Sequence, residues 1–114
     1  WSSDVCSSDL GGSGTPTTGN DKTSWLRAPA TLTCSSAALI SKTAPSGGSF
    51  VVAILLSTDG GSTFPTTITT LTLTTGNKVV TTSPTTALSA GDLLRLDITS
   101  VNGAADWTVQ LQAS

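Results

Sequence analysis

The stretch LLRLDITSVNGAADWTVQLQ, residues 93–112, carries the clearest secondary-structure signal in the chain. In its first half, every second residue from Leu94 to Ile98 is apolar and the residues between them are polar. In its second half, every second residue from Trp107 to Leu111 is apolar in the same way. Such alternation is typical of strands with one buried face, and Asn-Gly at positions 102–103 is a strong hairpin signal. The stretch therefore predicts two antiparallel strands that pair with each other.

Shorter strand signals recur between residue 25 and this stretch. The seven apolar residues from Phe50 to Leu56 predict a central strand covered on both faces; a buried helix is the alternative, but β-branched residues and flanking Gly favour the strand. Ile68 is out of phase with Leu71 and Leu73, which predicts a β-bulge. Seven or eight strands with turns about every ten residues predict an all-β fold, a single antiparallel β-sandwich that is jelly-roll-like. The residues expected to face the core are Trp25, Leu32, Cys34, Leu39, Val52, Ile54, Leu56, Leu71, Leu73, Val80, Leu94, Leu96, Ile98, Trp107, Val109 and Leu111.

The first ten residues, WSSDVCSSDL, show no strand or helix period. At all ten positions they resemble the translation of a common short-read sequencing adaptor, which implies an artefactual segment joined to a metagenomic gene fragment. The alternative is a genuine disordered tail. We expect residues 1–10 to be disordered and to pack against nothing, residues 11–24 to form a Gly/Thr-rich linker, and residues 25–114 to form the sandwich. Because the chain contains no Met, we expect it to be the C-terminal fragment of a longer protein.

The composition argues against most catalytic and metal chemistry. The chain has no His and no Glu, so the usual general base and the commonest metal ligand are absent. Beyond the first ten residues, Asp residues balance Lys and Arg, and no basic patch is available for nucleic acid. No apolar run approaches the roughly 20 residues of a membrane helix. We therefore expect no enzymatic activity, no catalytic residue, no cofactor, no metal site, no nucleic-acid partner and no membrane insertion.

The side chains that could still carry chemistry are few. Cys34 is expected to face inward as a small hydrophobe rather than to act as a reactive thiol, since nothing nearby would lower its pKa. Asp92 and Asp97 are five positions apart, in a turn and on an outward strand face, and nothing in the pattern brings them together. Arg95 and Asp97 are expected to form an exposed pair of little energetic weight.

The segment STDGGSTF, residues 57–64, fits the pattern S-x-D-x-G-x-T-[W/F] and resembles the Asp box of sialidases and other β-proteins. In that family the motif is a β-hairpin turn and carries no catalytic residue. We expect Asp59 to accept hydrogen bonds from backbone N–H groups and Phe64 to lie under the hairpin. The alternative, a metal site, is disfavoured because one Asp is a poor ligand set for calcium. A single copy of the motif and only two Arg exclude a sialidase propeller.

From residue 25 to 112 the order of these pieces resembles a domain of tailed-bacteriophage structural proteins. The resemblance rests on APSGGSFVVAIL, on GGSTF, and on LSAGDLLRLDITSVNGAADWTVQLQ; the loop NGAAD departs from the family, which often has a second Pro-Gly there. It implies a jelly-roll-like β-sandwich of a tail fibre or another virion-exposed protein, with a structural or receptor-binding role. The implied partners are other virion proteins, further copies in a homotrimer, or a cell-surface glycan. The positions that carry the pattern are Pro45, Gly47, Gly91, Asp92, Asp97, Val109 and Leu111.

The alternative is an extracellular carbohydrate-binding module of a secreted bacterial protein. Glycan sites usually display aromatic platforms, and four aromatic residues remain after the first ten. We expect Trp107 to be inward, Phe64 to belong to the hairpin and Trp25 to pack on the domain edge. Two exposed, coplanar aromatic rings would favour the module, whereas a self-complementary apolar face would favour a trimeric fibre.

Overall fold

The structure, a computed structural model, describes residues 6–21 and 25–114, and these residues form strands but no helix. None of them therefore forms a helix that could cross a membrane. The all-β prediction is confirmed. The strands are β1 (Cys6–Gly12), β2 (Leu26–Arg27), β3 (Leu32–Thr43), β4 (Phe50–Ser57), β5 (Thr66–Leu73), β6 (Val79–Thr82), β7 (Thr86–Leu88), β8 (Leu93–Ser100) and β9 (Ala105–Ala113).

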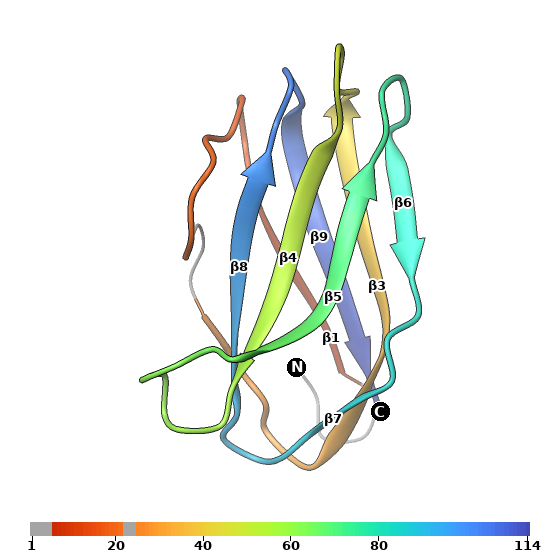
Figure 1. The fold of residues 1–114 in the computed structure, drawn as a ribbon. Helices are drawn as coiled ribbons and strands as arrows, with labels where there is room; N and C mark the ends of the chain where they lie inside the picture. Colours follow the sequence, from red (N-terminus) through yellow and green to blue (C-terminus); the bar gives the residue numbers. More distant parts are fainter. Residues whose placement is uncertain (1–5, 22–24) are drawn as a thin grey trace.

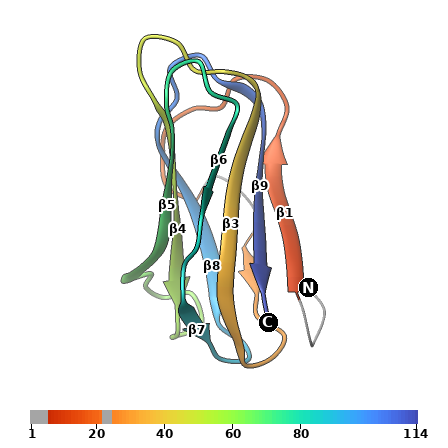
Figure 2. The same ribbon diagram turned by 90° about the vertical axis from the view of Figure 1, so that its right-hand side faces the viewer.

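Two antiparallel sheets pack face to face (Figures 1 and 2). The first sheet has the order β1-β9-β3-β6, with β7 also paired to β3, and the second has the order β2-β8-β4-β5. Both β6 and β7 pair antiparallel with β3, and the chain between them contains Pro84, which has no backbone N–H to donate. They therefore act as one interrupted edge strand, so the nine strands of the described residues correspond to eight positions in the sandwich.

The pairing of these strands is nested. β4 pairs with β5, β3 with β6 and β7, β2 with β8, and β1 with β9. A single long antiparallel ribbon, rolled up so that β3 meets β9 and β4 meets β8, produces this order. Such a roll with two four-stranded layers is the jelly-roll arrangement, so the predicted architecture is confirmed.

The Asn-Gly turn forms, but the hairpin predicted around it does not. Asn102 and Gly103 have φ values of 53° and 81°, and the N–H of Ala104 donates to the carbonyl of Val101. The flanking strands β8 and β9 nevertheless belong to different sheets. The Asn102 side-chain amide donates to the carbonyl of Ser49, which ties the turn to the start of β4. The turn thus carries the chain over the end of the sandwich, and the predicted pairing is wrong.

The buried layer between the sheets follows the predicted alternation closely. Every residue expected to face the core is buried except Val80, which is partly buried, and Trp25, which is 42% exposed. Phe50 is fully buried and meets Trp107 of the other sheet edge to face, with ring centroids 5.9 Å apart. β4 is central as predicted, but its outward residues are only half-buried. The buried apolar residues that the sequence analysis did not include are Ala28, Ala37, Phe50, Ile68, Leu88, Ala104 and Ala113.

The bulge predicted near Ile68 is confirmed. Ile54 lies opposite Thr69 while Leu55 lies opposite Thr67, so Ile68 is the extra residue on β5. Its side chain is buried, which explains why its apolar character is out of phase with Leu71 in the sequence.

The N-terminal strand is the largest departure from expectation. Cys6 to Gly12 pair in continuous register with β9, from Cys6 opposite Ala113 to Gly12 opposite Trp107. Disorder is therefore the wrong prediction for residues 6–10. Without β1, β9 would present a row of unpaired N–H and C=O groups along its length, and strand pairing through the backbone tolerates almost any side chains. Trp1 and Val5 lie outside the described residues, and an adaptor origin of residues 1–10 stays a prediction.

The segment after β1 crosses from one sheet to the other and is not a free linker. The N–H of Gly14 donates to the side chain of Asp106 in β9, and the N–H of Asp106 donates to the carbonyl of Gly14. Gly19 then exchanges two backbone hydrogen bonds with Ile98 of β8. We call residues 13–21 the strap; it closes one side of the sandwich and delivers the chain to β2 (Figure 1).

The contact of β1 with β9 can be tested at two neighbouring glycines. A Cβ atom at Gly11 would lie 2.2 Å from the carbonyl oxygen of Trp107, whereas one at Gly12 would meet nothing closer than 3.6 Å. We expect Gly11→Ala to lower the free energy of unfolding in urea by about 1–3 kcal/mol and Gly12→Ala to change it by less than about 0.5 kcal/mol. Both substitutions lower the conformational entropy of the unfolded chain by the same amount, so this effect cancels in the comparison. Equal changes in the free energy of unfolding would therefore mean that β1 does not pack against β9 in solution.

Candidate functional site

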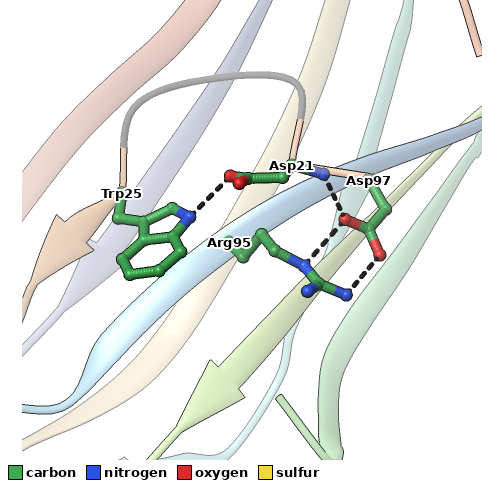
Figure 3. Close-up of polar contacts among 4 residues, drawn as sticks. All are labelled: Asp21, Trp25, Arg95 and Asp97. Atoms are coloured by element: carbon green, nitrogen blue, oxygen red, sulfur yellow. Dashed lines mark hydrogen bonds and ion pairs between the residues drawn. The ribbon is translucent and has the colours of Figure 1, made fainter. Parts of the chain in front are cut away.

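An aromatic and charged cluster lies where the strap, β8 and the β4–β5 hairpin meet on the outer side of the second sheet. We call it the Trp25 cluster; it consists of Asp21, Trp25, Phe64, Arg95 and Asp97, four of which are drawn in Figure 3. Its members come from three separate parts of the chain. They are brought together because the strap runs along the edge of β8, next to the hairpin.

The hairpin that supplies Phe64 is built as the Asp-box resemblance implies. The carboxylate of Asp59 accepts the N–H of Thr63 at 3.0 Å, the Thr63 hydroxyl, and the Ser57 hydroxyl at 2.7 Å. The Ser57 oxygen in turn accepts the N–H of Gly61 at 2.9 Å. The Thr63 hydroxyl and N–H, followed by the Ser57 hydroxyl, lower the pKa of Asp59 from 3.8 to about 2. Asp59 therefore holds the turn together, and the predicted structural role is confirmed.

Trp25 is partly exposed yet held on several sides. A Cβ atom at Gly61 would lie 2.5 Å from the indole ring, so only glycine allows the ring to pack this closely on the hairpin. The ring meets Phe64 edge to face, with centroids 5.1 Å apart and planes at 64°. Its Nε1–H donates to the carboxylate of Asp21 in the strap (Figure 3). The predicted inward position is wrong, because Trp25 packs on the outer side of the domain.

The Arg95–Asp97 pair is far less exposed than predicted. Arg95 Nη2 donates to Asp97 Oδ2 at 3.1 Å, and Nε lies 3.0 Å from Oδ1 as an ion pair without hydrogen-bond geometry (Figure 3). The N–H of Asp21 donates to Asp97 Oδ1 at 2.9 Å. Asp97 is only 6% exposed because the strap covers it, and these donors offset its loss of hydration. The guanidinium also lies 4.6 Å from the centre of the Phe64 ring, within cation–π range.

The other candidate residues lie apart from this cluster and serve the fold. Cys34 is a buried free thiol whose pKa is raised by burial, in agreement with the expectation of an unreactive side chain. Asp92 caps the turn before β8 by accepting the N–H of Ser89 at 2.8 Å. Asp92 and Asp97 thus have separate partners. Over residues 6–21 and 25–114, no group of three metal-binding side chains comes together.

The Trp25 cluster presents side chains that are suited to contact with another molecule. Every charged member of the Trp25 cluster is engaged by another member, and none is a nucleophile next to a base. The cluster instead presents a partly exposed Trp beside an Arg, and these residue types are enriched at the centres of protein interfaces. The two aromatic rings are not coplanar, so the platform that would favour a carbohydrate-binding module does not form.

Sequence reasoning missed Asp21 entirely. It lies in a Gly- and Thr-rich segment that reads as a linker, and its role depends on a hydrogen bond to Asp97, 76 residues later. Its positive φ of 59°, uncommon for a residue other than Gly, is a structural sign that the strap bends sharply there. No local pattern could have revealed it.

No protein-family model and no curated protein matches the chain. Solved structures do match its fold. The capsid structure of Helicobacter pylori bacteriophage KHP30 superposes with a TM-score of 0.58 at 10% identity, over 96% of this chain and 84% of that chain. The globular domain of the zebrafish complement 1qA protein superposes with a TM-score of 0.55 at 8% identity, over 96% of this chain and 94% of that chain. At such identities the likeness establishes a jelly-roll β-sandwich and nothing finer.

The Asp59 network has a testable pH dependence. A carboxylate whose folded pKa lies below its unfolded value adds stability above pH 3.8, and this contribution is lost as pH falls toward 2. We expect the thermal midpoint, followed by circular dichroism, to fall more steeply over this pH range in the wild type than in Asp59→Asn. Parallel curves for the two proteins would show that the carboxylate does not hold the hairpin.

The partners of Asp97 make a second prediction. Asp97→Ala removes the acceptor of the Asp21 N–H and of the Arg95 guanidinium, so we expect the free energy of unfolding to fall by about 1–3 kcal/mol in urea titrations. Thr99→Ala is the control, because Thr99 is the next outward position on β8 and is exposed. It should change stability by less than about 0.5 kcal/mol. Equal losses in the two variants would contradict a buried, strap-covered carboxylate.

Proposed function

We propose that this domain is a non-enzymatic building block of a tailed-phage virion, in a tail fibre or another exposed part of the particle. Its role there is to pack against neighbouring proteins and to present a surface to the host. In this role the protein is located on the virion.

The observation that carries the proposal is the jelly-roll fold, which superposes on the capsid structure of Helicobacter pylori bacteriophage KHP30 over most of both chains. The tailed-phage resemblance of residues 25–112, which rests on turn and strand motifs, points the same way. The surface chemistry supports a packing role. The outward positions of β5 are threonines, and those of β9 from 108 to 112 are Thr and Gln, so broad areas carry no charge that would oppose close contact.

The competing hypothesis, a carbohydrate-binding module of a secreted bacterial protein, lacks a matching observation. Trp25 is 42% exposed, but its neighbour Phe64 meets it at 64°. Phe50 and Trp107 are buried in the core. A sugar chain would therefore meet one ring rather than a row of parallel rings.

Location on particles tests the proposal directly. Antibodies raised against the purified chain should label phage particles in immunogold electron microscopy, on the tail or another exposed structure, and pre-immune serum should not. The gene should also lie among genes for tail, capsid or DNA-packaging proteins. Labelling of a soluble secreted protein, with a glycoside hydrolase encoded next to the gene, would overturn the proposal in favour of the carbohydrate-binding module.

A further inference from the structure

Three of the four sheet edges of this sandwich, those of β2, β6–β7 and β5, are protected to very different degrees; the fourth edge, β1, is seven residues long and contains the charged residue Asp9. In the second sheet, β2 is only two residues long and is continued by the strap, whereas β5 at the other end is eight residues long. In the first sheet, the edge opposite β1 is broken into β6 and β7, with Lys78 before it and Pro84 within the break. Short strands, Lys and Pro are the devices that stop an edge from pairing with another chain.

β5 carries almost none of these devices. No charged residue occurs from 60 to 77, and no Pro interrupts the strand Thr66–Leu73. Only the bulge at Ile68 disturbs it, and beyond the bulge residues 69–73 continue in regular register with β4. On the side away from β4, no backbone pairing of β5 occurs among the described residues. The tie to β6 that the structure records uses side chains, since the Thr69 and Thr82 hydroxyls lie 2.8 Å apart.

We propose that the β5 edge is an interface with a second copy of this chain, in which two β5 strands pair antiparallel about a two-fold axis and join the second sheets of both copies. A two-fold axis perpendicular to the sheet pairs a strand with its own copy in antiparallel order and keeps the inner and outer faces aligned, and the strand pairs within this fold are antiparallel as well. Figure 2, viewed from this side of the sandwich, shows β5 with no further strand of its own sheet beyond it.

The sequence of β5 is complementary to itself in this arrangement. With the axis at Leu71, Thr70 of one copy faces Thr72 of the other, and Thr69 faces Leu73. Thr70 and Thr72 are exposed on the outer face, and Leu71 and Leu73 are buried on the inner face, so both faces continue across the junction. Cross-strand Thr pairs are favourable, and no like charges meet. The inference is separate from the virion proposal, because a secreted module with the same edge would pair in the same way.

Cysteine cross-linking tests both the contact and its register. In a Cys6→Ser background, the double variant Thr70→Cys/Thr72→Cys should give a covalent dimer under mild oxidation, seen on a non-reducing gel. The matched control is Gln110→Cys/Gln112→Cys, which has the same spacing at exposed outward positions of β9, in the interior of the other sheet. We expect the β5 variant to cross-link and the β9 variant to stay monomeric. Equal cross-linking of the two variants overturns the proposal.

Introducing positive charge at the proposed contact gives an independent measurement. Thr70→Lys/Thr72→Lys places Lys opposite Lys twice, and should weaken dimerisation about tenfold or more in light scattering over a wide concentration range. Gln110→Lys/Gln112→Lys adds the same charge on β9 and should leave the dimer unchanged. The thermal midpoint of each variant shows whether it is folded. A wild-type chain that stays monomeric at its highest soluble concentration, or a dimer insensitive to the β5 lysines, overturns the inference. The inference is also overturned if the β5 edge pairs only with an added extended peptide from another protein and not with a second copy of this chain.

Discussion

The structure depends on one constraint: β9 must bury every second side chain against the other sheet while its backbone is hydrogen-bonded on both sides. Trp107, Val109 and Leu111 point into the core, where Phe50 meets Trp107 edge to face. β3 supplies the backbone partners on one side of β9, and β1 supplies them on the other. Side chains project perpendicular to the sheet, whereas backbone hydrogen bonds lie in its plane. Burial of the side chains and pairing of the backbone are therefore two separate requirements, and β9 has to satisfy both.

The same constraint explains the course of the N-terminal segment. Once β1 is paired with β9, the chain has to reach the far sheet before β2 can pair with β8, and it does so through the strap. Hydrogen bonds of Gly14 with Asp106 and of Gly19 with Ile98 fix the crossing at both ends. The strap then covers Asp97, and this burial turns an outward strand position into a buried carboxylate with several donors. The Trp25 cluster is thus a consequence of closing the roll.

Period-two alternation identified most of the core from sequence because it depends only on which face of a strand is buried. The alternation could not identify which strands pair with each other. A strand such as β9 would bury Trp107 and Val109 equally well in either of the two sheets. The Asn102-Gly103 turn was found, yet it joins two sheets instead of two paired strands. Burial of Asp97 and the role of Asp21 were missed for another reason. They arise from a contact across 76 residues that has no trace in the local pattern.

The edges of this sandwich differ in how they are protected from pairing with another chain. Here the β2 edge is closed by the strap and the β6–β7 edge is broken by Pro84, whereas β5 has only a bulge. Nothing in the stability of the sandwich requires that difference, because Lys at an exposed, outward position of β5 such as Thr70 or Thr72 would leave the core intact. The lack of charge along the β5 edge is therefore a property of the surface rather than a requirement of the fold.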